Sequence, residues 1–146
     1  RLSHYNARAD RRARDAEREN KMIVGIGADI AEIDRIAAAI ERFGQAFLER
    51  VFTAEEIRYC ERHKAKFERY AARFAAKEAA MKALGTGWRR GVRWRDIEVR
   101  NAASGKPGIY FAGEAANHAA RLGARHSHLS ITHSGNLAFA QVILEN

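Results

Sequence analysis

The sequence has a single cysteine, Cys60, among its 146 residues. One thiol cannot form an internal disulfide and leaves no thiol pair for a structural zinc site, which fits a reducing compartment. No apolar run approaches the roughly 20 residues that a membrane-spanning helix needs, and the first residues are charged rather than secretory in type. We therefore expect a cytoplasmic protein without a membrane partner.

Acidic residues are in the minority. The chain has 26 Lys and Arg against 18 Asp and Glu, which gives a formal net charge of +8. This excess predicts an anionic partner, and it leaves open whether that partner is a nucleic acid, an acidic protein or a phosphorylated small molecule. The length and the 47% of hydrophobic residues are typical of one compact domain.

The pattern of apolar residues divides the chain into an extension and one domain. Residues 1–21 are dense in Arg, Asp and Glu, so we interpret them as a charged N-terminal extension outside a domain of residues 22–146. Within that domain the pattern predicts a strand at 22–28, helices after Asp29, after Thr53 and at about 66–84, a hairpin at 97–111, a helix at 113–122, and strands at 128–132 and 137–144. The predicted order is β-α-α-α-β-β-α-β-β, an α+β fold with a largely antiparallel sheet.

Two glycines, Gly25 and Gly27, lie toward the end of the first predicted strand. The third glycine of a dinucleotide-binding fingerprint would fall at position 30, which is Ile30, so that motif is excluded. The chain also lacks a Walker lysine-serine pair. The two glycines can instead be interpreted as allowing a helix to pack closely on the strand.

Acidic and basic groups that could bind a metal and phosphates occur in two places. Asp29 is predicted at a junction between strand and helix, where it is either a helix N-cap or, together with Glu78, a Mg²⁺ ligand. Glu78 and Lys82 are four residues apart and share a helix face, so they are either a solvent-exposed ion pair or part of a site. The residue pattern alone does not decide between these alternatives.

Two further segments have more than one interpretation. The strand at 128–132 places His128, Ser130 and Thr132 on one polar face, which could line a site or simply end a strand. The basic and aromatic segment from Trp88 to Arg95 could stack on bases and contact phosphates, or it could anchor a loop in the core. A basic nucleic-acid-binding module is therefore the alternative function.

Five stretches in order resemble the small bacterial holo-acyl-carrier-protein synthase family of 4′-phosphopantetheinyl transferases. They cover Met22 to Glu145, and they are the segments 25–33, 73–79 with Lys82, 85–87, 105–107 and 128–133. Each segment alone is a weak signal, whereas all five at suitable distances are specific.

The resemblance implies transfer of phosphopantetheine from coenzyme A to a serine of apo acyl carrier protein, in fatty acid biosynthesis. The product released is adenosine 3′,5′-bisphosphate, and the nucleophile belongs to the partner. Asp29 and Glu78 would bind Mg²⁺, Lys82 would lie against the phosphates, and the base would be Glu78 or a metal-bound water. The fold would be that of the family, with coenzyme A in clefts between the subunits of a homotrimer.

The resemblance also suggests binding residues. Those for coenzyme A would be Arg73, Lys77, Lys64, Lys66, Gly85, Gly87, Lys106, Pro107, His128 and Ser130. Arg35 and Arg42 lie seven residues apart on the first predicted helix of the domain, so they would align and steer the acidic carrier protein. In this interpretation neither nucleic acid nor a membrane is a partner.

Overall fold

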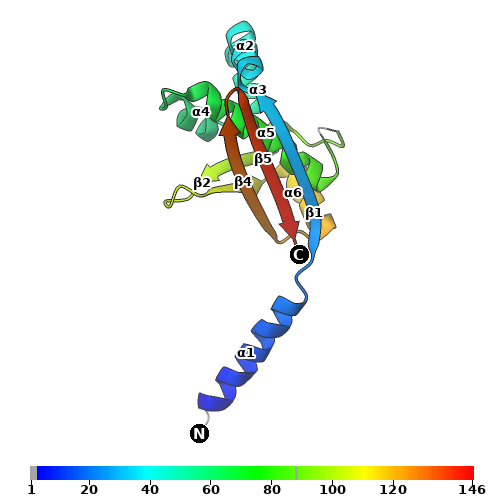
Figure 1. The fold of residues 1–146 in the computed structure, drawn as a ribbon. Coiled ribbons are helices and arrows are strands. Elements are labelled where there is room, and N and C mark those ends of the chain that lie inside the picture. Colours follow the sequence, from blue (N-terminus) through cyan, green and yellow to red (C-terminus); the bar gives the residue numbers. More distant parts are fainter. Residues whose placement is uncertain (1–2, 88) are drawn as a thin grey trace.

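The computed structural model describes residues 3–87 and 89–146 and has an α+β architecture (Figure 1). Helix α1 extends away from the remainder of the chain (Figure 1). The elements in chain order are α1 (Ser3–Glu19), β1 (Ile23–Glu32), α2 (Ile33–Phe43), α3 (Gln45–Val51), α4 (Ala54–Glu61), α5 (Lys66–Leu84), the 3-10 helix η1 (Trp94–Asp96), β2 (Ile97–Asn101), β3 (Pro107–Phe111), α6 (Gly113–Leu122), β4 (His126–Ser134) and β5 (Leu137–Glu145). No helix in the described ranges is long and apolar enough to cross a membrane.

The described strands form two antiparallel sheets. One has the order β1-β5-β4, and the other is the β2-β3 hairpin. The long helix α5 crosses one face of the three-stranded sheet (Figure 1). The expected largely antiparallel sheet is therefore confirmed, and α5 contributes more buried residues to the core than any other element.

The close contact between β1 and α5 depends on the two glycines. A Cβ atom on Gly27 would lie 2.0 Å from the backbone oxygen of Ala79, and one on Gly25 would lie 2.2 Å from that of Ala83. These distances are far below any van der Waals contact, so only glycine permits this approach. The interpretation of Gly25 and Gly27 as a packing device is confirmed.

Several predicted ends of helices are confirmed because local interactions define them. Thr53 and Glu56 form the expected capping box at the start of α4. Helix α5 ends at Gly85, which adopts a left-handed conformation, and α6 ends in the same way at Gly123. The predicted hairpin corresponds to β2 and β3.

Two predictions about the first part of the domain are wrong. Strand β1 continues to Glu32, which pairs with Leu137 of β5, so Asp29 lies inside a strand and is not a helix N-cap. The sequence-based prediction also missed α3, which begins directly after Gly44 has ended α2 and buries Leu48 and Val51. In the described chain, four α-helices rather than three follow β1 before the hairpin.

Candidate functional site

Asp29, Glu78 and Lys82 meet where β1 packs on α5. Asp29 lies two residues after Gly27 and therefore points to the same face of β1, toward the helix. The Lys82 ammonium donates to Asp29 Oδ1 at 2.8 Å and to the carbonyl oxygen of Ala28 at 3.1 Å. The Lys82 side chain is 55% exposed, whereas that of Asp29 is 11% exposed. The cation is thus accessible and its partner carboxylate is largely enclosed.

The second oxygen of Asp29 is unsatisfied. Asp29 Oδ2 is buried and accepts no hydrogen bond from a nitrogen of the described residues; its polar neighbour is the Glu78 carboxyl, which can bond to Asp29 only while it is protonated. A buried carboxylate oxygen without a partner is costly, so such an atom suggests a ligand. Glu78 supplies a second carboxyl group beside it.

The electrostatics of Glu78 reflect this proximity. Burial, followed by the adjacent Asp29 carboxylate, raises the pKa of Glu78 from 4.5 to about 7, and the Lys82 ammonium opposes the rise. The Glu78 carboxyl therefore holds its proton more tightly than an ordinary glutamate does. A hard divalent cation such as Mg²⁺ would replace that proton and would bind oxygen atoms of both carboxylates.

The donor set is small. The described part of the chain contains no group of three or more His, Cys, Asp and Glu side chains that could hold a metal ion. A cation bound by Asp29 and Glu78 would therefore take its remaining ligands from water or from substrate, which is the usual state of Mg²⁺ in phosphate-handling sites.

A second feature is a cavity of about 260 Å³ beside the N-terminal half of α5. Its lining includes Arg73, whose Nη2 donates to Asn101 Oδ1 at 3.0 Å and whose guanidinium lies 3.8 Å from the centre of the Tyr59 ring. The Nε of Arg73 is buried and unpaired within the described residues. This fixed cation with an unused donor suits an anionic ligand.

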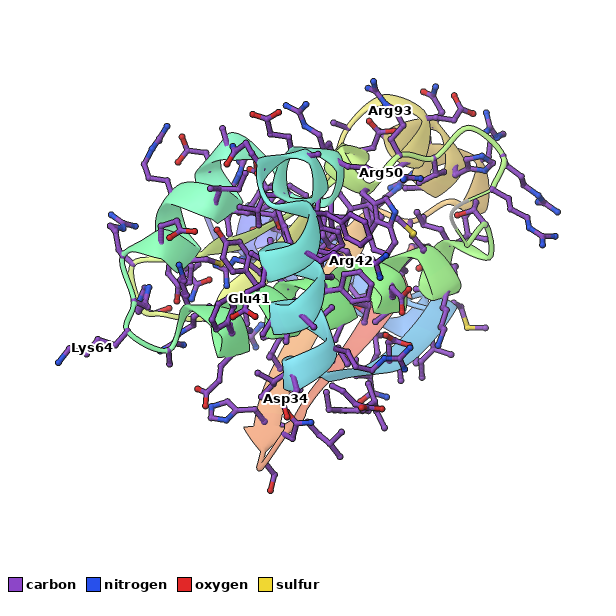
Figure 2. The ribbon with its side chains drawn as sticks, turned by 90° about the horizontal axis from the view of Figure 1, so that it is seen from above. Asp34, Glu41, Arg42, Arg50, Lys64 and Arg93 are labelled. Atoms are coloured by element: carbon purple, nitrogen blue, oxygen red, sulfur yellow. The ribbon has the colours of Figure 1, made fainter. Side chains whose placement is uncertain are left out.

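Of the predicted coenzyme A contacts, Pro107 shares that cavity with Arg73. Lys106 and Lys64 are exposed, and Figure 2 shows Lys64 projecting from the turn before α5. Lys66 approaches Glu61 at 3.4 Å. The single chain does not bring these lysines into one group, and their assignment stays a prediction.

The structure separates the remaining predicted contacts. Gly85 and Gly87 follow the end of α5 next to Lys82, both with positive φ angles. His128 and Ser130 are exposed on β4, on the opposite face of the sheet from α5, and His128 Nε2 lies 3.1 Å from Glu145. Within one chain, His128 and Ser130 are therefore apart from both the Asp29 group and the Arg73 cavity.

The prediction that Lys77 contacts coenzyme A is wrong. Lys77 is completely buried and donates to the equally buried Glu56. Glu56 also accepts hydrogen bonds from the backbone nitrogens of Thr53, at 2.9 Å, and Val99, at 3.0 Å. Burial lowers the pKa of Lys77, and the Glu56 carboxylate opposes that change. The pair ties α4, α5 and β2 together and is not available to a ligand.

The two candidate arginines for the carrier protein are accessible. Arg35 is exposed on α2 and lies 3.9 Å from Glu32. Arg42 is at the other end of this helix (Figure 2). Its guanidinium lies 5.1 Å from the centre of the Phe43 ring. Their role stays a prediction.

The structure does not support the alternative function of nucleic-acid binding. Trp88 lies outside the described residues. Trp94 stacks on Phe74 with ring centres 4.9 Å apart, so one face of its indole anchors the loop to the core. Sequence reasoning missed Tyr59 and Asn101 as neighbours of Arg73, because neither residue carries a motif of its own.

Residues 25–141 match the family model of the 4′-phosphopantetheinyl transferase superfamily. The holo-[acyl-carrier-protein] synthase of Solibacter usitatus is 59% identical over 125 residues, which is 86% of this chain and all of that protein. The synthase of Koribacter versatilis is 54% identical over the same shares.

Solved structures of related synthases have the same fold as this chain. The crystal structure of the Neisseria meningitidis synthase has a TM-score of 0.79 at 36% identity and covers 86% of this chain and 100% of that one. The Bacillus anthracis synthase, solved in complex with CoA (3′,5′-ADP), has a TM-score of 0.71 at 42% identity over 86% and 98%. These relatives give no support to the nucleic-acid alternative. The chain belongs to the 4′-phosphopantetheinyl transferase superfamily.

Proposed function

We propose that this chain is a holo-acyl-carrier-protein synthase. It transfers the 4′-phosphopantetheine arm of coenzyme A to a serine of apo acyl carrier protein and releases adenosine 3′,5′-bisphosphate, in fatty acid biosynthesis. The observation that carries the proposal is the convergence of Asp29, Glu78 and Lys82 at the contact of β1 with α5. Relatives that carry the synthase name, and a neighbour solved with coenzyme A, support it.

Mg²⁺ bound by Asp29 and Glu78 would neutralise negative charge on the pyrophosphate of coenzyme A. The unsatisfied oxygen of Asp29 and the raised pKa of Glu78 both support this assignment. Lys82, exposed beside them, would add a positive charge next to the phosphates.

The reaction is a displacement at phosphorus. The serine oxygen of the carrier protein forms a bond to the phosphorus that bears pantetheine, and the bond from this phosphorus to the bridging oxygen breaks. The electron pair leaves with adenosine 3′,5′-bisphosphate, where Lys82 stabilises the developing charge. The serine proton would pass to Glu78 or to a water molecule beside it.

Coenzyme A would also use the cavity around Arg73. The unused Nε of Arg73 is the support for this part of the proposal. The exposed Lys64 and Lys106 and the half-buried Lys66 are the proposed outer contacts for its phosphates. Gly85 and Gly87 would allow close approach beside Lys82.

The proposed assembly is a homotrimer formed through the open face of the three-stranded sheet. On this face Ile26 and Ile30 of β1 are 57% and 59% exposed, and they pair with Ile143 and Phe139 of β5. Two or more copies of the chain would cover this apolar surface. The His128 side of the same sheet would then border a cleft between subunits, where His128 and Ser130 could reach coenzyme A.

Mass spectrometry tests the activity directly. Apo acyl carrier protein incubated with this protein, coenzyme A and Mg²⁺ is expected to gain the mass of a phosphopantetheine arm. Asp29→Ala and Glu78→Ala should abolish the gain, whereas Glu55→Ala, at an exposed carboxylate paired with Arg58, should retain it. Absence of any gain, or an equal gain with all three variants, contradicts the proposal.

Residues 1–21 are proposed to lie outside the catalytic domain, and the reaction is placed in the cytoplasm, where the thiol of Cys60 stays reduced. Figure 1 shows α1 projecting from the remainder of the chain. Deletion of residues 1–21 is expected to leave the transfer rate unchanged in the same assay, and a large loss would assign α1 a part in the reaction.

A further inference from the structure

Three arginines surround a cavity of about 600 Å³ that is separate from the Asp29 group and from the Arg73 cavity. They come from two places in the chain, Arg50 at the end of α3 and Arg93 and Arg95 in and beside η1. The remaining lining comes from Thr53, Val92, Trp94, Asp96, Ala112 and Gly113.

The cavity carries uncompensated positive charge. Arg93 pairs with Asp96 at 3.1 Å, and that buried carboxylate also accepts from the backbone nitrogen of Arg93 at 3.0 Å. In the described part of the chain, Arg50 and Arg95 are exposed and have no ion-pair partner. Two arginines are therefore left to meet negative charge from another molecule.

The walls of the cavity are partly apolar and rigid. Val92 is buried, and Trp94 is held by its stacking on Phe74. A wall of this kind together with guanidinium groups fits a protein segment that presents both acidic and apolar side chains. A simple phosphate would make no apolar contact with Val92 and Trp94.

The cavity continues the basic surface of α2. Helix α2 packs on α3, and α3 packs on η1. Figure 2 shows Arg42, Arg50 and Arg93 in succession along these elements. Arg42 was already a proposed contact for the acidic carrier protein, and the exposed Phe43 beside it adds an apolar group. A partner on α2 therefore has a direct route across α3 to the cavity.

We infer that the Arg50–Arg93–Arg95 cavity is a second docking region for the acyl carrier protein and receives an acidic, partly apolar segment of that partner. The inference rests on the proposed function. If the inference holds, Arg50 and Arg95 contribute to the affinity for the carrier protein and do not contact coenzyme A.

Steady-state transfer kinetics test this with the double variant Arg50→Glu/Arg95→Glu. Arg93 is left intact because its pairing with Asp96 supports η1. The KM for carrier protein should rise about tenfold and lose part of its salt dependence, while the KM for coenzyme A stays within about twofold. The neutral pair Arg50→Gln/Arg95→Gln should give a smaller rise in the same direction.

The matched control is Arg11→Glu/Arg12→Glu on α1, where two exposed arginines undergo the same charge change. The control should leave the KM for carrier protein unchanged. If the KM for carrier protein rose equally in both double variants, the effect would come from net charge alone, and the inference would be overturned. A parallel rise in the KM for coenzyme A would assign the cavity to the small substrate and would also overturn it.

Binding of apo carrier protein in the absence of coenzyme A separates this inference from the proposed function. If the wild-type chain transfers nothing, the proposed function fails. The inference is still supported if wild-type chain binds the carrier protein and Arg50→Glu/Arg95→Glu weakens that binding about tenfold, and it fails if binding is equal or undetectable.

Discussion

At the scale of single residues, the environment of Glu78 is what supports its proposed role as a metal ligand. Its carboxyl group is partly buried beside Asp29, so its pKa is raised to about 7. A carboxylate next to a second carboxylate is poorly stabilised until a cation binds, so the metal-free chain holds a proton there that a divalent cation would displace. The cost of placing the two groups together should be visible in the stability of the metal-free protein.

We expect Glu78→Gln to change the pH dependence of stability. A carboxyl whose pKa rises from 4.5 to about 7 on folding stabilises the folded state fully below 4.5, and this contribution is lost as the pH rises through 7. The difference in unfolding free energy, wild type minus Glu78→Gln, should therefore fall between about pH 5 and pH 8 in chelator. Chemical denaturation measures it, and a flat difference contradicts the shift. Mg²⁺ at the higher pH should stabilise the wild type more than the variant.

The buried pair of Lys77 and Glu56 shows a different use of charge. Glu56→Gln would leave the Lys77 ammonium buried without its counter-charge, so we expect a loss of about 3 to 5 kcal/mol of unfolding free energy. The neighbouring exposed substitution Glu55→Gln should change it by less than about 0.5 kcal/mol. Urea denaturation compares them. An equally small effect of both would mean that water reaches Lys77 in the variant.

At the scale of elements, the β1–α5 contact both builds the core and assembles the site. Gly27→Ala would place a methyl group 2.0 Å from the backbone oxygen of Ala79, and a helix backbone cannot rotate away as a side chain can. We expect a loss of about 3 kcal/mol of stability. Because Asp29 and Glu78 would move apart, phosphopantetheine transfer should fall as well.

The matched control for Gly27→Ala is Gly108→Ala. A methyl group on Gly108 would meet its nearest atom, in the ring of Tyr110, at 3.7 Å, which is an ordinary contact. This substitution should change stability by less than about 1 kcal/mol and leave transfer intact. Thermal unfolding and the transfer assay compare the two variants, and similar behaviour would mean that α5 has room to shift.

The elements that were predictable from sequence are those with local determinants. Thr53 begins α4 and Gly85 ends α5 through hydrogen bonds within a few residues, so their sequence patterns were sufficient. The extent of β1 depends on pairing with β5 more than 100 positions later, so the junction assigned to Asp29 was wrong. Helix α5 is buried almost all round, and its alanine-rich pattern could not indicate that Lys77 faces the interior.

The site was predictable for a related reason. Glu78 and Lys82 share a helix face by their spacing alone, and the ordered family motifs supplied Asp29 as their partner. The Arg73 cavity was only partly foreseen, because Tyr59 and Asn101 come from separate elements that tertiary packing brings together. The Arg50–Arg93–Arg95 cavity depends on the contact of α3 with η1, and α3 itself was not predicted.

At the scale of the whole molecule, the three-stranded sheet is covered by α5 on one face and open on the other. Ile26 and Ile30 are more than half exposed on the open face, next to Ile143 and Phe139. An apolar surface of this kind across two paired strands is unusual for a chain that stays monomeric. The trimer proposed above would bury it.

Ile26→Asp/Ile30→Asp should therefore disrupt the assembly while leaving each chain folded, because both side chains point away from the α5 core. Light scattering after size exclusion should give three times the 16.4 kDa chain mass for the wild type and the single-chain mass for the variant. Leu122→Asp, at an exposed leucine on α6, is the matched control and should keep the wild-type mass. If His128 acts across subunits, the monomeric variant should also lose transfer activity. A wild-type chain that elutes as a monomer and is active would contradict both the proposed trimer and the proposed role of His128.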